Sequence, residues 1–309
     1  MAKRQDRRKR KKRKWPWILL IVVLVVAGAG TAYGYSIWHN VKSTVDDQLH
    51  EPVSGIDTKV TKRKVTDQEP INLLLLGVDE RKGDKGRSDT MVVMTLDPAE
   101  DQMQLVSIPR DTRTTIVGHG TVDKINHSYA FGDSEMSVDT AENFLDIDLD
   151  YYVRMNMEGL DQLVDAVDGI TVMNERAFSQ NGHSFDTGEL QLNGEEALAY
   201  VRKRKGDPEG DLGRNGRQRQ VIEGIIKKGA NFKVVNKIGS IMDVLGQNMT
   251  TNMTFSDMKD LATNYRSARK DISDYQMAGE GTRIDDRYYQ IMSDEEIAKV
   301  HDMITKFGS

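Results

Sequence analysis

The chain has 309 residues, a formal net charge of −5 and no cysteine. The lack of cysteine excludes a small disulfide-bonded scaffold, and it excludes thiolate chemistry at a metal or as a nucleophile. The length allows one globular domain of roughly 240 residues after an N-terminal segment of different composition.

That N-terminal segment combines a basic tail with an apolar stretch. Residues 3–14 contain ten Lys or Arg and one acid, Asp6, whereas the 24 residues from 15 to 38 contain no charge. As a helix the uncharged stretch rises about 36 Å, which is enough to cross a hydrocarbon layer of about 30 Å. Trp15 and Trp38 stand at its ends, where aromatic rings favour the headgroup layer. We therefore predict a transmembrane helix over 15–38.

The charge on either side of this helix predicts its orientation. Cations flank one side only, so residues 1–14 are expected to form a cytoplasmic tail and the chain after Trp38 to lie outside the cell. The predicted location is the cell membrane, with a single pass. Cleavage is the alternative, since residues 27–29 (AGA) resemble a signal-peptidase site, but the apolar stretch is longer than the usual 7–15 residues. The membrane segment also accounts for the basic tail, so no nucleic-acid partner is expected.

The exported part carries the opposite charge. Residues 39–309 contain 33 basic and 47 acidic residues, a formal charge of −14. Such a domain repels anionic polymers on average. Any site for an anion must therefore be a local basic cluster.

The chain after the membrane segment begins with a predicted stalk. Val41, Val45 and Leu49 are four residues apart, which predicts a short amphipathic helix that Pro52 ends. A polar stretch up to residue 69 is predicted to be a linker. We therefore expect a stalk and linker over 39–69 and one extracellular domain over 70–309.

The domain mixes strand and helix patterns. Its first apolar run, 71–78, has no polar face, as expected for a strand covered on both sides. This pattern predicts an α/β domain with a central sheet between helices. The expected strands are 71–78, 91–96, 103–108, 151–155, 170–173 and 273–278, and the expected helices are 137–147 and 157–168.

Charged residues stand at the ends of the first three strands. Asp79 follows the first strand, Arg87 and Asp89 precede the second, and Arg110 and Asp111 end the third. Sites in α/β folds usually form at strand ends that share one edge of the sheet. Taken singly, each residue is more typical of a solvated turn.

A basic cluster lies further along the chain. Residues 202–219 hold seven basic and three acidic residues, a local charge of +4 within an acidic domain. Arg202 and Arg204 are two residues apart, so in an extended segment their side chains point the same way. Exposed guanidinium groups of this kind bind phosphate oxygens in pairs, which favours an anion site over a solvated surface.

The end of this cluster has helical spacing. If a helix starts near Gly213 with Asp211 as its cap, Arg214, Arg217 and Gln218 share one face. A helix N-terminus carries partial positive charge and free amide groups. The segment is therefore expected to bind a pyrophosphate.

Two acids in the same region suit a metal ion. Asp79 and Asp89 are predicted to hold Mg²⁺ or Mn²⁺ together with substrate phosphates. Arginines with such a cation would neutralise the charge of a diphosphate leaving group. His127 is a candidate base, although a hydrogen-bonded structural role is more typical. A Walker loop, a GxSxG elbow and an HExxH pair are all absent.

Together these segments resemble the LytR–CpsA–Psr family of Gram-positive bacteria. The resemblance rests on the order and spacing of short motifs across about 140 residues. These motifs are GVDE at 77–80, RSDT at 87–90, SIPRDT at 107–112, KIN with AFG at 124–132, and RKR through GRNGRQ at 202–218, after the basic tail and apolar segment.

The resemblance implies a phosphotransferase. Family members move an anionic glycopolymer, such as wall teichoic acid, from a polyprenyl-diphosphate carrier to a peptidoglycan hydroxyl and form a phosphodiester. The implied partners are the lipid-linked glycopolymer, peptidoglycan and the cell membrane. The implied fold is a three-layer α/β/α sandwich with a mixed central sheet, preceded by one transmembrane helix.

The family's functional positions carry over to this sequence without a departure. The metal positions are Asp79 and Asp89, and the catalytic positions are Asp79, Arg110 and Asp111. Lys124 and Asn126 match a motif of less defined role. The diphosphate-binding positions are Arg87, Arg110, Arg202, Arg204, Arg214 and Gln218.

Three points stay open in this interpretation. The base that accepts the hydroxyl proton is Asp79 or Asp111. The family's apolar pocket for the lipid chain has Phe131, Leu145, Val153, Leu160 and Val164 as candidate lining residues, each of which also suits an ordinary core. A pyrophosphatase acting on the carrier lipid and a non-catalytic lipid-binding regulator are the alternative functions.

Overall fold

The computed structural model describes residues 35–36, 38–80, 86–204, 206–229 and 238–307. The predicted tail, 1–14, and nearly all of the predicted membrane segment, 15–38, lie outside these ranges. Within them, no helix has both the length and the apolar character needed to cross a membrane.

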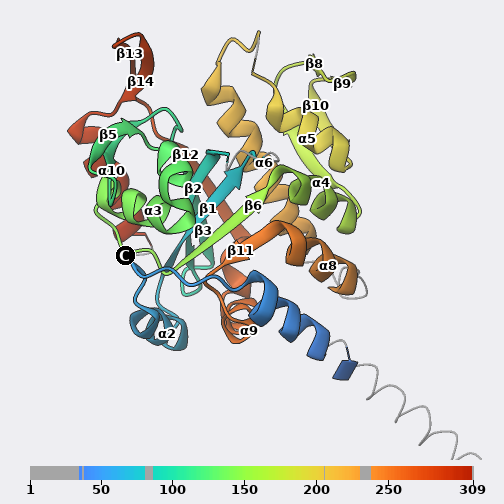
Figure 1. Cartoon of the computed structure of the whole chain (residues 1–309). Helices are drawn as coiled ribbons and strands as arrows, with labels where there is room; N and C mark the ends of the chain where they lie inside the picture. Colours follow the sequence, from blue (N-terminus) through green and yellow to red (C-terminus); the bar gives the residue numbers. More distant parts are fainter. Residues whose placement is uncertain (1–34, 37, 81–85, 205, 230–237, 308–309) are drawn as a thin grey trace, which may run out of the picture.

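A mixed six-stranded sheet forms the centre of the domain, as predicted (Figure 1). β1 lies in the middle, antiparallel to β2 and parallel to β6. The outer strands pair antiparallel at one side, β11 with β6, and parallel at the other, β12 with β3. In sheet order the strands are β11 (Met249–Thr251), β6 (Tyr151–Asn156), β1 (Ile71–Val78), β2 (Ser88–Asp97), β3 (Gln102–Ser107) and β12 (Asp271–Gln276).

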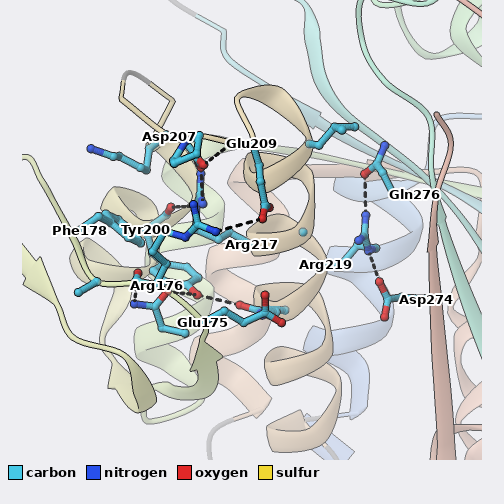
Figure 2. A pocket seen from close by; sticks show the side chains of 18 of the residues that line it. Glu175, Arg176, Phe178, Tyr200, Asp207, Glu209, Arg217, Arg219, Asp274 and Gln276 are labelled. Carbon is cyan, nitrogen blue, oxygen red and sulfur yellow. Dashed lines mark hydrogen bonds and ion pairs between the residues drawn. The ribbon is translucent and has the colours of Figure 1, made fainter. Parts of the chain in front are cut away.

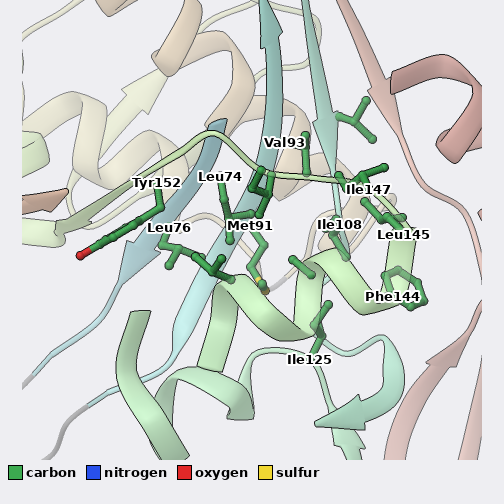
Figure 3. Packing of buried hydrophobic residues seen from close by; sticks show 14 of the residues in the cluster. Leu74, Leu76, Met91, Val93, Ile108, Ile125, Phe144, Leu145, Ile147 and Tyr152 are labelled. Carbon is green, nitrogen blue, oxygen red and sulfur yellow. The ribbon is translucent and has the colours of Figure 1, made fainter. Parts of the chain in front are cut away.

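Apolar side chains cover both faces of this sheet. On one face, Leu74 and Leu76 of β1 share a core with residues of α3 (His127–Leu145) and α10 (Asp294–Thr305), part of which Figure 3 shows. On the other face, Ile71 and Leu73 share a core with residues of α2 (Thr58–Asp67), α6 (Asp211–Gly229) and α9 (Phe255–Asn264). Because side chains alternate along a strand, an apolar run such as β1 is stable only between two helical layers.

A third core lies beside the sheet. It joins α4 (Met157–Ala166) and α5 (Gly194–Arg202) to α6 through Val164, Tyr200 and Val221. The predicted strand at 170–173 is present as β7 (Ile170–Asn174), but it pairs with β10 (Gly188–Leu192) outside the central sheet. A short hairpin, β8 (Phe178–Gln180) and β9 (His183–Phe185), completes this side.

The predicted stalk packs against the domain. Residues 38–43 are helical and continue into the π-helix η1 (Thr44–Leu49), in which Val45 and Leu49 are fully buried next to α8 (Ile238–Asn248). The expected amphipathic helix is therefore confirmed. The linker expected up to residue 69 is wrong in part, because it contains α2, whose Val65 belongs to a hydrophobic core. A polar helix with one buried stripe has few apolar residues, and its sequence resembles a linker.

Two further hairpins lie outside the central sheet, and the helix α3 is broken near its start. The hairpins are β4 (Arg113–Ile116) with β5 (Thr121–Lys124), and β13 (Glu280–Ile284) with β14 (Arg287–Ile291). The helix predicted over 137–147 begins ten residues earlier, at His127, and is interrupted by non-helical backbone at Gly132 and Asp133. That break hides the helical period of its first turn. A short 3-10 helix, η2 (Arg266–Lys270), precedes β12.

Stability should depend on the ionisation of Glu142 in α3. Burial raises the pKa of Glu142 to about 7, the amide of Leu149 opposes this shift, and nearby carboxylates add to it. Between pH about 4.5 and 7 the folded protein therefore holds a proton that the unfolded chain releases, so stability falls as pH rises. We expect Glu142→Gln to remove this decline and to raise the melting temperature at pH 8. Thermal unfolding at pH 5 and pH 8 tests this, with the exposed Glu100→Gln as the control.

Candidate active site

The topology of the sheet brings the predicted charged segments to one edge. β1 and β2 are antiparallel neighbours, so the end of β1 meets the start of β2, with Val78 opposite Ser88. β2 and β3 are also antiparallel, which places the end of β3 beside the same edge. The amide of Asp79 donates to the carbonyl of Arg87 at 3.3 Å. Residues from three strand ends are thus held together by main-chain pairing.

Two adjoining cavities lie at this edge and form one polar cleft. Both are lined by Asp79, Asp89, Arg110 and Arg204. The first, of about 690 Å³, we call the helix lobe, because it extends toward α4, α5 and α6. The second, of about 780 Å³, we call the hairpin lobe, because it extends toward the β13–β14 hairpin.

The cleft gathers every residue that the family resemblance assigned to the metal, catalytic and diphosphate-binding positions. Arg202, Arg214 and Gln218 line the helix lobe. In the hairpin lobe the selected residues are Arg87, Asp111, Lys124, Asn126 and His127. Residues from positions 79 to 218 therefore face one space, as expected for a site assembled from several loops.

Acidic and basic side chains alternate across the floor of the cleft. Arg110 contacts three carboxylates, with Nη1 at 2.8 Å from Asp89 Oδ1 and Nε at 3.5 Å from Asp211 and 3.8 Å from Asp111. Lys124 Nζ lies 2.7 Å from the other oxygen of Asp111. Burial lowers the pKa of Arg110, but the carboxylates outweigh it and the pKa is raised, so this residue stays charged. Asp211 was expected only as a helix cap; here it begins α6 and pairs with Arg110.

The arginines of the basic cluster differ in exposure. Arg202 and Arg204 are exposed, as expected for groups that meet a ligand from solvent. Arg214 instead is 6% exposed, and its Nη2 lies 3.2 Å from Asp211 and donates to the carbonyl of Asp89 at 3.3 Å. Burial, together with the charge of Arg110, lowers the pKa of Arg214. The expectation that all of these arginines are exposed is wrong for Arg214, because the first turn of α6 is covered by the strand ends.

The opposite face of α6 does not belong to the cleft. Arg217 was expected beside Arg214, but it turns to a separate cavity of about 550 Å³, where it pairs with Asp207 at 2.7 Å (Figure 2). It also donates to the carbonyl of Lys203 at 2.6 Å. Arg219 binds Asp274 on the same side. These arginines hold the 203–207 segment and β12 against α6, which is a structural role.

Several buried polar atoms in the cleft make no hydrogen bond within the described residues. They are Arg110 Nε, Arg214 Nε, Asn126 Oδ1 and Asp211 Oδ1. An unsatisfied buried donor costs roughly 1–3 kcal/mol, and Arg110 Nε has only its longer ion-pair contacts with Asp211 and Asp111, so the cleft holds guanidinium groups with donor capacity to spare. The ligand that fits arginine donors is an anion with several oxygens.

The fit for a divalent cation rests on two carboxylates. Asp79 and Asp89 line both lobes, and both offer the hard oxygen ligands that Mg²⁺ and Mn²⁺ prefer. No group of three or more His, Asp or Glu in the described ranges is placed to hold a metal ion. Two carboxylates suffice only where phosphate oxygens supply the remaining ligands. The residues therefore fit a cation that binds together with a diphosphate.

An apolar cavity of about 230 Å³ adjoins the helix lobe. The two share Asn156, Met157, Val201 and Gln218, whereas the hairpin lobe shares no lining residue with the apolar cavity. Most of its wall comes from β1, β6, α4 and α6. An apolar chain attached to a group in the helix lobe would thus have a dry space directly beside it.

Two of the five candidate pocket residues line this cavity, namely Val153 and Leu160. Leu145 and Val164 lie in the first and third cores, and Phe131 is on the surface, stacked on His119. The apolar lining residues of α6, among them Ile222, Ile225 and Ile226, were not among the candidates. Their spacing of three and four residues was the available signal.

The hairpin lobe contains two further residues that the sequence analysis missed. Arg283 and Tyr288 reach the cleft from the β13–β14 hairpin, far from the other lining residues in the sequence. No motif or spacing marks them, because their position depends on how the hairpin packs. The main chain of β14 fixes it, since the amide of Gln290 donates to the carbonyl of Asp111 at 2.9 Å.

The fold and cleft define an α/β protein in which a polar cleft lined by arginines and acids adjoins an apolar cavity. The model of the LytR_cpsA_psr family matches residues 32–306, and this chain belongs to that family.

Named relatives agree with this assignment. The polyisoprenyl-teichoic acid–peptidoglycan teichoic acid transferase TagU of Bacillus subtilis is 50% identical over 257 residues, which cover 83% of this chain and 84% of TagU. A structure described as TagT bound to LIIa-WTA is 28% identical with a TM-score of 0.69, covering 83% of this chain and 98% of TagT. An Enterococcus faecalis protein described as a transcriptional regulator is 40% identical with a TM-score of 0.71, covering 78% of this chain and 88% of that protein.

Proposed function

We propose that this chain is a polyisoprenyl-teichoic acid–peptidoglycan transferase. The observation that carries this proposal is a polar cleft, rich in arginine, that adjoins an apolar cavity. A polyprenyl diphosphate has the same two parts, a charged head and an apolar chain. The relatives named as teichoic acid transferases support the choice of polymer and acceptor.

In this proposal the cleft binds the diphosphate and stabilises the charge of the leaving group. Arg87, Arg110, Arg202, Arg204, Arg214 and Gln218 are the diphosphate-binding residues. The largely buried Arg110 and the buried Arg214 are held in place by Asp89 and Asp211, so they need little reorganisation as charge develops on the departing phosphate. Asp79 and Asp89 would hold the Mg²⁺ or Mn²⁺, which supplies Lewis-acid stabilisation of the phosphoryl oxygens.

Transfer must be separated from hydrolysis, because a pyrophosphatase would use the same cleft with water as the acceptor. We expect labelled lipid-linked polymer to become attached to peptidoglycan when both are present, with little free polymer. Release of free polymer at the same rate with and without peptidoglycan would favour the hydrolase. A non-catalytic lipid-binding regulator would leave the donor intact in both cases.

Chain-length selectivity tests the apolar cavity. Leu160→Phe adds volume to the wall of a cavity of about 230 Å³. We expect it to weaken binding of a long-chain polyprenyl diphosphate about tenfold and to leave a short-chain analogue unaffected, since over-packing costs about 1–3 kcal/mol. Titration of both lipids against the variant measures this difference. Equal weakening of both lipids would mean that the chain binds elsewhere.

We propose that the protein is anchored by residues 15–38, with the domain outside the cell. A shared membrane confines enzyme and lipid-linked substrate to one surface, which raises their effective concentration. The proposal names no nucleic-acid partner, although one relative is described as a transcriptional regulator. In the proposed orientation the domain lies outside the cell, on the other side of the membrane from DNA.

Protease accessibility tests this orientation. Protease added to intact protoplasts should degrade residues 39–309 and spare the basic tail, because the membrane shields only the cytoplasmic side. Mass spectrometry of the mature protein should also find the peptide that spans Ala29. A protected domain would reverse the orientation, and consistent loss of that peptide would indicate cleavage.

A further inference from the structure

We infer that the hairpin lobe is the subsite for the acceptor glycan, in which His127 takes the proton of the attacking hydroxyl and Tyr288 packs against the sugar. This inference rests on the proposed transferase function. The ligand class is a saccharide with a free hydroxyl, bound as a neutral ring.

The direction of attack identifies the acceptor's side of the cleft. In phosphoryl transfer the attacking and leaving oxygens lie roughly in line on opposite sides of the phosphorus. The leaving group is the lipid phosphate, and its chain has the apolar cavity beside the helix lobe. The hairpin lobe shares Asp79, Asp89, Arg110 and Arg204 with the helix lobe but has no contact with the apolar cavity. An incoming hydroxyl therefore reaches the phosphorus through the hairpin lobe.

His127 is oriented for proton transfer in this lobe. Its Nδ1 lies 2.8 Å from Asp123 Oδ2 in β5. An ionised carboxylate only accepts hydrogen bonds, so the proton is on Nδ1 and Nε2 keeps a lone pair. Asp123 is itself held by the amide of Lys124 at 2.8 Å and by the hydroxyl of Tyr289 at 3.2 Å. Burial raises the pKa of Asp123, but these hydrogen bonds and His127 outweigh it and lower the pKa.

The carboxylates of the lobe suit this role less well. Asp111 is paired with Lys124 at 2.7 Å and Asp89 with Arg110 at 2.8 Å, so each carboxylate already has a cationic partner. Asp79 is assigned to the cation in the proposed function. The other ionisable groups that face the lobe around His127 are Arg87, Arg204, Asp211, Arg283 and Tyr288. His127 differs from the carboxylates of the lobe because its ion-pair partner is itself a carboxylate, Asp123, and histidine is the side chain that most often serves as a general base.

Tyr288 provides a flat surface at the rim of the same lobe. The residue is 44% exposed although it lines the cleft. The phenol end rests on Gly281, where an added Cβ would lie 2.7 Å from the hydroxyl oxygen. A glycine under an aromatic ring in a hairpin holds the ring in place. An amphipathic ring of this kind packs against the C–H face of a sugar while its hydroxyl stays hydrated.

The hairpin that carries Tyr288 is hydrogen-bonded to Asp111 and to Asp123, the partner of His127. Gln290 pairs with the main chain of Asp111 and Tyr289 binds Asp123, so β14 connects the rim to the dyad of His127 and Asp123. The hairpin projects at one side of the domain (Figure 1). A long glycan chain can reach an acceptor subsite only if that subsite lies at an exposed edge of the domain.

The proposed reaction is a single substitution at the phosphorus. The acceptor oxygen forms a bond to the phosphorus that carries the polymer, and the bond from that phosphorus to the bridging oxygen breaks. The bridging oxygen leaves with the electron pair as part of polyprenyl phosphate. The acceptor proton moves to His127 Nε2 and passes from there to solvent.

The test for His127 uses steady-state ligation by the full-length protein in membranes, with lipid-linked polymer and a soluble peptidoglycan glycan. We expect His127→Ala to lower kcat about 10²- to 10⁴-fold with the KM of donor and acceptor unchanged. In the dependence of kcat on pH, the fall in kcat at low pH reports protonation of the imidazole, and this fall should be absent from His127→Ala. Asp123→Asn should give a smaller loss and move that fall to a different pH. An unchanged kcat and pH profile in His127→Ala would overturn the role of His127.

The test for Tyr288 is the KM of each substrate. Tyr288→Ala should raise the acceptor KM about tenfold and leave the donor KM unchanged. Tyr288→Phe keeps the ring and should restore at least part of this loss, and Ile291→Ala, an exposed residue of the same hairpin that does not line the cleft, is the matched control. A rise in the donor KM instead would place the polymer under the hairpin and overturn the acceptor subsite.

Folding and the proposed function are checked separately. Thermal unfolding of each variant shows whether it is folded. If the wild-type protein transfers no polymer, the proposed transferase fails. If the wild type transfers polymer and His127→Ala and Tyr288→Ala match it in kcat and in both KM values, only the acceptor subsite fails.

Discussion

Asp79→Ala and Asp89→Ala should each abolish polymer transfer, and removal of divalent cations with EDTA should do the same. Both carboxylates line the two lobes of the cleft, where they face the same bound diphosphate. Two such acids repel each other unless a cation lies between them or one is protonated. Ligation assays with added Mg²⁺ or Mn²⁺ measure the requirement directly.

The neutral isostere Asn tests whether charge is the essential property. Asp79→Asn and Asp89→Asn keep the shape but lose the charge that holds the cation, so we expect them to be nearly as inactive as Ala. Glu189→Gln, an exposed change on β10, is the control for the loss of one acid. Lipid binding should survive in all of these variants, because the arginines and the apolar cavity remain. Full activity in EDTA or in both Asn variants would refute the metal site.

Arg202→Ala and Arg204→Ala should weaken polyprenyl-diphosphate binding by about 10- to 150-fold, the equivalent of about 1.5–3 kcal/mol for one charge-assisted contact. Both side chains are exposed at the helix lobe, so neither change should unfold the domain. Substitution by Lys should restore little affinity, because an ammonium group cannot form two parallel bonds to phosphate. Lipid titration measures the affinity, and the exposed Arg266→Ala, outside the cleft, is the matched control.

Arg214→Ala should lower both the stability of the domain and its affinity for the lipid. Its guanidinium group is buried and paired with the partly exposed Asp211 at 3.2 Å, so its removal leaves that carboxylate with fewer partners. Breaking a fully buried pair costs about 3–5 kcal/mol of stability, and the loss here should be smaller because Asp211 is partly exposed. We expect a lower melting temperature as well as weaker lipid binding. Wild-type lipid affinity in Arg202→Ala, Arg204→Ala and Arg214→Ala together would exclude the cleft as the diphosphate site.

The central strands and the helix over residues 38–49 could be predicted because their patterns are local. β1 is apolar at nearly every position, and only a strand covered on both faces tolerates that composition. Val41, Val45 and Leu49 have helical spacing whatever surrounds them. The transmembrane segment has an equally local pattern and stays a prediction. The linker was the error, because α2 buries so little surface that its sequence resembles a solvated segment.

The chemistry of the cleft was also visible in the sequence, since acids and arginines stand where apolar strands end. The pairing of β1, β2 and β3 is what brings Asp79, Asp89 and Arg110 to one edge. The sequence therefore determined which residue types are available for a diphosphate. It also indicated the family, through the order of the motifs.

Three positions depend on tertiary packing alone. Arg214 is buried, Arg217 points away from the cleft, and Tyr288 lies at the rim of the cleft. Each of these positions depends on contacts between segments that are far apart in the chain, and such contacts leave no period in the sequence. The apolar cavity is a second example, because Val153 and Ile222 line it only where β6 lies beside α6. Local patterns select the elements, whereas the space between elements exists only after they pack.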